Sequence, residues 1–170
     1  MTHTELAKYA LEHFVKHGRA APLPPNLPEE LTENRAGVFV SLKKQGNLRG
    51  CIGTIMPTKP SVAEEIMRNA VSACSEDPRF LPVREDELCD LVYSVDVLME
   101  PEVIDSLEML DVKRYGVIVT SEDYRRRGLL LPNLDGVDTV EEQVAIAMQK
   151  AGIAMNETIN LERFEVIRYT

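Results

Sequence analysis

The segment from Gly37 to Ile55 constrains the fold more than any other part of this 170-residue chain. An apolar run, GVFVSLK at 37–43, is followed by the turn-forming residues Gln45-Gly46-Asn47 and by a second extended run from Leu48 to Ile55. Two runs of strand-forming residues on either side of a short polar turn are typical of a β-hairpin. The sequence therefore predicts a pair of antiparallel strands near the start of the chain.

Two registers are possible for this hairpin. A two-residue loop at Gln45-Gly46 would set Leu42 opposite Arg49 and mix polar and apolar groups on one face. A three-residue loop separates the faces, and its pairs are Lys43–Arg49 and Ser41–Cys51 on one face and Leu42–Gly50 and Val40–Ile52 on the other. We favour the second register, although it sets two cations opposite each other. Alternation then gives a packing face with Leu48 and Ile52 and a presenting face with Arg49 and Cys51.

Hydrophobic periodicity and capping residues predict the remaining elements. A proline-rich stretch at 21–34 predicts an extended arm. Three helices are predicted, and their N-cap residues are Thr4, Ser61 (in a capping box with Glu64) and Thr139. Four further strands are predicted, at Leu91–Met99, Tyr115–Ser121, Gly128–Leu131 and Leu161–Tyr169. This order lacks the strict alternation of a doubly wound fold. We predict one domain over 1–170, of the α+β class, with a largely antiparallel sheet flanked by helices.

Composition excludes several classes of function. With 19 basic and 28 acidic residues the net charge is -9, which repels nucleic acid and anionic membranes. No apolar run approaches the ~20 residues that span a bilayer. The three cysteines are far apart and form no CxxC pair, so we expect reduced thiols in a cytoplasmic protein without a metal or other cofactor. The sequence gives no indication of the oligomeric state.

Cys51 is the candidate for chemistry. A guanidinium at Arg49 on the same face would favour the thiolate, the form that acts as nucleophile or metal ligand. Gly50 and Gly53 remove bulk around the thiol, as happens where a ligand or another backbone approaches closely. The competing interpretation is that Cys51 is a small buried hydrophobic residue and that Arg49 serves an ion pair.

Other charged residues have both a functional and a structural interpretation. Asp77 and Arg79 could order a loop or bind an anion. Arg127, in the run Arg125 to Arg127, could hold a phosphate or an acidic partner, although a solvated turn is the alternative. His13 and His17 are spaced to bridge a metal or to supply a base to Cys51, but solvated helix-surface histidines are commoner. The acidic run Glu85-Asp86-Glu87 predicts solvated surface.

The run Leu48–Gly53 (LRGCIG) resembles the signature of the AMMECR-domain family, to which prokaryotic AmmeMemoRadiSam system protein A also belongs. Similarity continues at 37–44, 69–70, 77–80, 127–132, 138–149 and 163–166. The resemblance implies an α+β domain with a larger and a smaller subdomain and a functional face at the motif, where Arg79 would be a second site residue. It also implies partnership with a Memo-like protein and a radical SAM protein. This chain has no CxxxCxxC for a radical SAM cluster, so the partners would be separate chains.

Two hypotheses follow. The first is an accessory binding subunit that docks on these partners through the LRGCIG face. The second is a small enzyme in which Cys51 is nucleophile or ligand, Arg49 stabilises the thiolate or an anionic substrate, and Arg79 helps to hold that small anionic ligand. We favour the first, because the sequence lacks a convincing base, a metal-ligand constellation and a cofactor-binding loop. The residues assigned to binding in either case are Gly50, Gly53, Asp77, Arg79 and Arg127.

Overall fold

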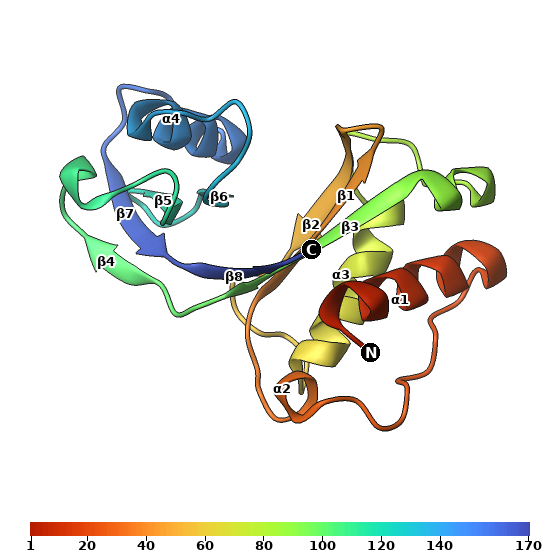
Figure 1. Ribbon diagram of the computed structural model, residues 1–170. Coiled ribbons are helices and arrows are strands. Elements are labelled where there is room, and N and C mark those ends of the chain that lie inside the picture. The colour runs from red at the N-terminus through yellow and green to blue at the C-terminus, as the bar shows by residue number, and fades with distance from the viewer. The chain divides into compact units, whose positions relative to one another are not determined.

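The computed structural model describes all residues from 1 to 170 and divides them into two units, each with its own sheet (Figure 1). The first unit contains residues 1–98 and 167–170, and the second contains residues 99–166. The mixture of helices with antiparallel sheets confirms the predicted α+β class. The strands of the predicted sheet are divided between two sheets, one in each unit. No helix combines the length and apolar character needed to cross a membrane.

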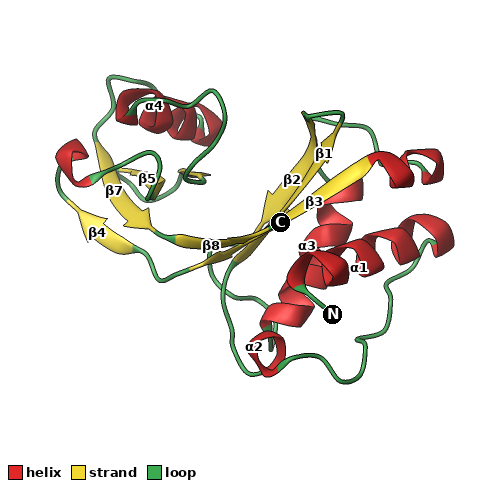
Figure 2. Cartoon of the chain, viewed as in Figure 1, coloured by secondary structure: helices red, strands yellow, loops and turns green.

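The first unit is a four-stranded sheet with two helices packed on it (Figure 2). The strands run in the order β2-β1-β3-β8 and are β1 (Val38–Lys44), β2 (Asn47–Gly53), β3 (Leu91–Leu98) and β8 (Val166–Tyr169). Helix α1 (His3–His17) packs against β3 and against α3 (Val62–Ser75), which in turn packs against β1 and β2. A short helix α2 (Glu29–Thr32) and a 3-10 turn η1 (Glu85–Asp90) complete the unit. The motif strand β2 therefore lies at an edge of its sheet.

Local capping explains where the helices begin and end. The Ser61 hydroxyl accepts a hydrogen bond from the Glu64 amide at the start of α3, so the predicted N-cap is present, although the Glu64 side chain does not complete the predicted capping box. Helix α1 begins earlier than expected, because Thr2 rather than Thr4 forms a capping box with Glu5. It ends at Gly18, whose φ of 70° is the left-handed conformation that glycine adopts readily.

The second unit is built around the sheet β4-β7-β5-β6. Its strands are β4 (Glu102–Ile104), β5 (Gly116–Ser121), β6 (Arg127–Leu130) and β7 (Ile159–Phe164), and a 3-10 turn η2 (Leu107–Met109) follows β4. Helix α4 (Val140–Ala151) packs on β5 and β6 and is capped by Thr139, as predicted. Its buried side chains form a second hydrophobic core with those of β5.

The predicted terminal strand at 161–169 is two strands. β7 ends at Phe164 and pairs with β4 and β5, whereas β8 begins at Val166 and belongs to the sheet of the first unit. A strand-like sequence does not show which neighbouring strands it will pair with, so the sequence of this segment could not reveal that the chain changes sheets.

The hairpin combines features of both registers considered for it. The pairs Ser41–Cys51, Leu42–Gly50 and Val40–Ile52 are confirmed. The expected Lys43–Arg49 pair was wrong: the turn contains only two residues, both at positive φ, and a bulge next to Lys43 makes Leu48 its partner. The bulge also moves Leu48 off the packing face and leaves 42% of it exposed.

Candidate functional site

Cys51 lies in the middle of the edge strand β2 and is half-buried. Its Sγ is 3.1 Å from the hydroxyl oxygen of Ser41, directly across the strand pair. The preceding residue, Gly50, faces α3 so closely that a Cβ there would lie 2.4 Å from the carbonyl oxygen of Ala73. Glycine at this position therefore lets the motif strand lie against the helix backbone.

Asp77 and Arg79 bind the outward-facing backbone of Cys51. The Cys51 amide donates to Oδ2 of Asp77 at 3.0 Å, and Nη2 of Arg79 donates to the Cys51 carbonyl oxygen at 3.2 Å. An edge strand normally leaves such groups free to pair with another strand. Here two side chains occupy the donor and the acceptor of one residue, so the loop after α3 is fastened to the motif strand.

The carboxylate of Asp77 is the centre of this attachment. Its side chain is only 2% exposed and also accepts from the amide, Nε and Nη2 of Arg79. Burial alone would raise the pKa of Asp77, but the hydrogen bonds from Arg79 and from the Cys51 amide outweigh burial and lower it. Asp77 and Arg79 thus act as a structural pair, and 49% of the Arg79 side chain remains exposed.

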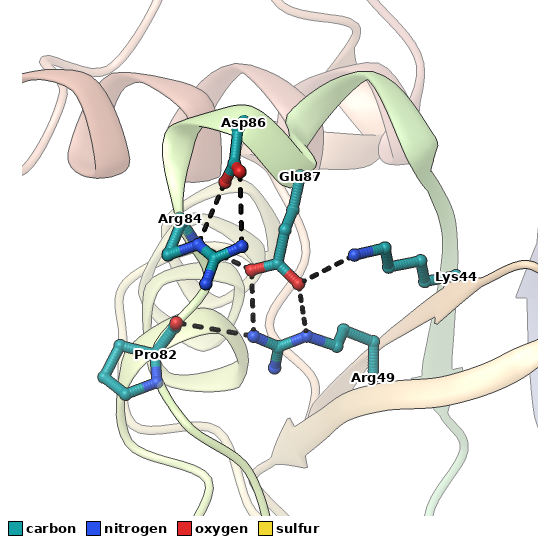
Figure 3. A network of polar contacts seen from close by, with 6 residues as sticks. All are labelled: Lys44, Arg49, Pro82, Arg84, Asp86 and Glu87. Atoms are coloured by element: carbon teal, nitrogen blue, oxygen red, sulfur yellow. Dashed lines mark hydrogen bonds and ion pairs between the residues drawn. The ribbon is translucent and has the colours of Figure 1, made fainter.

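Arg49 forms an ion pair with Glu87 (Figure 3). Its Nε and Nη2 donate to the two carboxylate oxygens of Glu87 at 3.0 and 3.1 Å, and Nη2 also donates to the carbonyl oxygen of Pro82 at 3.4 Å. Lys44 and the amide of Arg84 add two further bonds to the same carboxylate. This ion pair occupies the guanidinium that could otherwise stabilise a thiolate.

Glu87 is the important residue that sequence reasoning missed. The prediction that it belongs to solvated surface was wrong, because its side chain is 10% exposed and bridges η1 to β1 and β2. Hydrogen bonds from Arg49 lower the pKa of Glu87 to about 2. Its neighbours Glu85 and Asp86 are exposed, as expected. No local signal separates the three acidic residues.

The loop from Asp77 to Val83 follows the edge of β2 as a consequence of these bonds. Arg79 attaches it at Cys51, the Pro82 carbonyl attaches it at Arg49, and the amide of Val83 donates to the carbonyl oxygen of Cys74. Between these anchors, Leu81 is 83% exposed. The hydrogen bonds that order this loop therefore keep the large apolar side chain of Leu81 exposed to solvent beside the motif strand.

A second missed residue, Glu65, orders the segment after the motif. It lies on α3, is 1% exposed, and accepts hydrogen bonds from the hydroxyls of Thr54 and Thr58 and from the Thr58 amide. Asn69, one turn along α3, donates to Thr54 and to the carbonyl oxygen of Val38. Gly53 has Phe39 for a neighbour: a Cβ there would lie 2.3 Å from its ring.

The histidine pair lies on α1, which packs on α3 and β3. His13 is hydrogen-bonded to the carbonyl oxygen of Arg19, and its ring centroid is 4.6 Å from that of His17. No group of three or more His, Cys, Asp or Glu side chains is placed to hold a metal ion. A role of either histidine toward Cys51 stays a prediction.

Arg127 belongs to the second unit. It begins β6 and donates to the carboxylate of Glu162 on β7 at 3.1 Å. Arg126 instead binds Glu157 and the carbonyl oxygen of Gly152. Each of these two guanidiniums therefore has an internal carboxylate partner, and the proposed binding role of Arg127 stays a prediction.

These features define a class: an α+β protein of two units whose site is an edge strand fastened by an adjacent loop. The chain belongs to the AMMECR1 family, whose model matches residues 4–170. The LRGCIG-bearing strand β2 lies within that match.

Relatives agree with this assignment. A protein of Thermotoga maritima is 51% identical over 94% of this chain and 91% of its own length. A protein of Clostridium acetobutylicum is 51% identical over 98% of this chain, but the chain spans only 35% of that relative. The crystal structure of an uncharacterized protein from Pyrococcus horikoshii is similar with a TM-score of 0.88 and 33% identity, covering 98% of this chain and 88% of that one.

Proposed function

We propose that this chain is a cytoplasmic accessory subunit that docks on Memo-like and radical SAM partner proteins through the LRGCIG face. The observation that carries the proposal is the exposed Leu81, held between the Arg79 and Pro82 attachments to the motif strand. Exposed apolar side chains on an ordered scaffold lose little conformational freedom on binding, which favours association. Leu48, on the motif strand itself, is a second exposed apolar residue.

The charges around the motif support docking over catalysis. Arg49 is bound by Glu87, and Asp77 is bound by Arg79 and by the Cys51 amide. Groups engaged in this way order the surface but supply no free base to the thiol. The longer relative of Clostridium acetobutylicum, of which this chain spans 35%, carries further sequence beside the shared region. That arrangement is compatible with a domain that works beside others.

The proposal is tested by co-expression with candidate Memo-like and radical SAM proteins followed by affinity purification. Leu81→Asp should reduce the recovered partner, because it places a charge at the centre of the proposed interface. Val103→Asp is the matched control, since Val103 is 81% exposed in the second unit. Equal recovery with both variants, or no recovery with the unaltered chain, would count against docking through this face.

One observation favours the alternative enzyme that uses Cys51. The pKa of Arg79 is raised first by its hydrogen bonds to Asp77 and also by the charge of Cys51, so this half-exposed guanidinium lies within electrostatic reach of the thiol. We infer that in such an enzyme Arg79, rather than Arg49, would stabilise the thiolate or hold a small anionic ligand. Selective alkylation of Cys51 separates this alternative from docking.

A further inference from the structure

A cavity of about 440 Å³ lies in the first unit between α1, α3 and the proline-rich arm. Its apolar walls come from all three segments and include Phe14, Leu23, Met67 and Val71. Four lining residues belong to α3. They are spaced three or four positions apart and so share one face of that helix: Glu64, Met67, Arg68 and Val71. The volume falls within the ~300–1,000 Å³ typical of small-molecule sites.

The walls of this cavity are fastened in place. The hydroxyl of Tyr9 donates to the carbonyl oxygen of Pro22 at 2.9 Å, which ties the arm to α1. Nε of Arg35 donates to the carbonyl oxygen of Lys59 at 3.0 Å. Lys59 also lines the cavity, so this bond fixes the backbone of its wall there. A preformed cavity loses little entropy when a ligand enters.

Two opposite charges in the lining have no partner. Lys59 and Glu64 are both half-buried, and neither forms an ion pair. Arg68, one turn beyond Glu64 on α3, instead binds Glu76 through two contacts of 3.3 and 3.4 Å. Because both side chains are partly exposed, water solvates their charges, and a ligand that displaces this water must supply a complementary charge to each of them.

We infer that this cavity binds a small zwitterion with an apolar side chain, of the class of the large apolar amino acids. The ligand carboxylate pairs with the Lys59 ammonium, the ligand ammonium pairs with the Glu64 carboxylate, and the side chain packs against Phe14, Met67 and Val71. A simple carboxylate would leave Glu64 unpaired, and a simple amine would leave Lys59 unpaired. This site is separate from the proposed docking face.

The test is calorimetric and NMR titration of the full chain with L-phenylalanine, L-leucine and L-methionine. At least one of these should shift the amides of Met67 and Val71. The best of them should bind at least about ten-fold more tightly than its N-acetyl form, which lacks the cation, and than its amide, which lacks the anion. Absence of binding, or a smaller ratio for either derivative, would overturn the inference.

Matched variants locate the binding. Lys59→Gln and Glu64→Gln should each weaken the binding of that amino acid by about ten-fold or more. Lys113→Gln, at an exposed lysine of the second unit, should leave binding unchanged. Circular dichroism confirms that each variant is folded before titration. Unchanged affinity in folded Lys59→Gln or Glu64→Gln protein would overturn the assignment of the charges.

Discussion

Arg49 and Glu87 form a bidentate ion pair, in which Nε and Nη2 of the guanidinium donate to separate carboxylate oxygens at 3.0 and 3.1 Å. The two residues are 38 positions apart in sequence. Their contact joins the motif strand β2 to the turn η1, and Lys44 on β1 binds the same carboxylate. The cation of the LRGCIG motif therefore serves first to order the surface around Cys51.

Replacing the carboxylate should destabilise the protein. Glu87→Gln leaves Arg49 and Lys44 without an anionic partner, and we expect the free energy of unfolding to fall by about 1–3 kcal/mol. Urea unfolding measures the change. Glu122→Gln is the control, because Glu122 is exposed and such substitutions change stability by less than about 0.5 kcal/mol. Equal stability of the two variants would contradict the structural role of Glu87.

The same ion pair predicts a pH dependence. Because the pKa of Glu87 is lowered from 4.5 to about 2 on folding, its contribution is fully present above about 4.5 and is lost as the pH falls toward about 2. The stability difference between unaltered protein and Glu87→Gln should therefore be constant near neutral pH and should shrink over that acidic range. A difference that stays constant throughout the acidic range would show that Glu87 has an ordinary pKa in the folded chain.

The main hairpin pairs were predictable because a local pattern determines them. Alternation of apolar and polar residues identified Val40–Ile52 and Ser41–Cys51 as pairs. Alternation failed at Arg49, because a bulge inserts an extra residue in β2 while the side chain bonds to Glu87, which is distant in sequence. Glu87 itself was missed for the same reason: its burial depends on partners from β1 and β2.

The candidate site was predicted in part. Residue types and family similarity pointed to Asp77 and Arg79, and the structure brings both onto the backbone of Cys51. Their manner of contact was not predictable, since bonds to a backbone amide and carbonyl leave no mark on the sequence of β2. The change of sheet at Glu165 was also hidden, because it depends on which strands lie beside the chain.

Asp77 should control the order of the motif strand. Asp77→Ala removes the acceptor of the Cys51 amide and the partner of Arg79. We expect hydrogen exchange at the Cys51 amide to accelerate by at least about ten-fold as local opening becomes easier. Asp123→Ala, at an exposed aspartate of the second unit, should leave that exchange rate unchanged. Unaltered protection of Cys51 in Asp77→Ala would contradict the attachment.

The three cysteines should differ in alkylation rate. Cys74 should react slowest, because it is 3% exposed and burial raises its pKa to about 11. Cys89 is exposed and should react fastest, with half-buried Cys51 between them. Peptide mass spectrometry over a pH series measures all three together. A Cys51 that reacts before Cys89, and slows in Arg79→Ala, would favour the enzyme, whereas one no faster than Cys74 would exclude a nucleophile.

The most direct test of the docking proposal compares how partner affinity responds to loss of the Cys51 thiol and to a charge at the exposed Leu81. Purified partner, Memo-like or radical SAM, is titrated with the unaltered chain, with Cys51→Ser and with Leu81→Asp. If the motif face is a docking surface, Cys51→Ser should change the Kd by less than about two-fold, and Leu81→Asp should weaken binding by about ten-fold or more. Loss of affinity in Cys51→Ser with full affinity in Leu81→Asp would contradict the account.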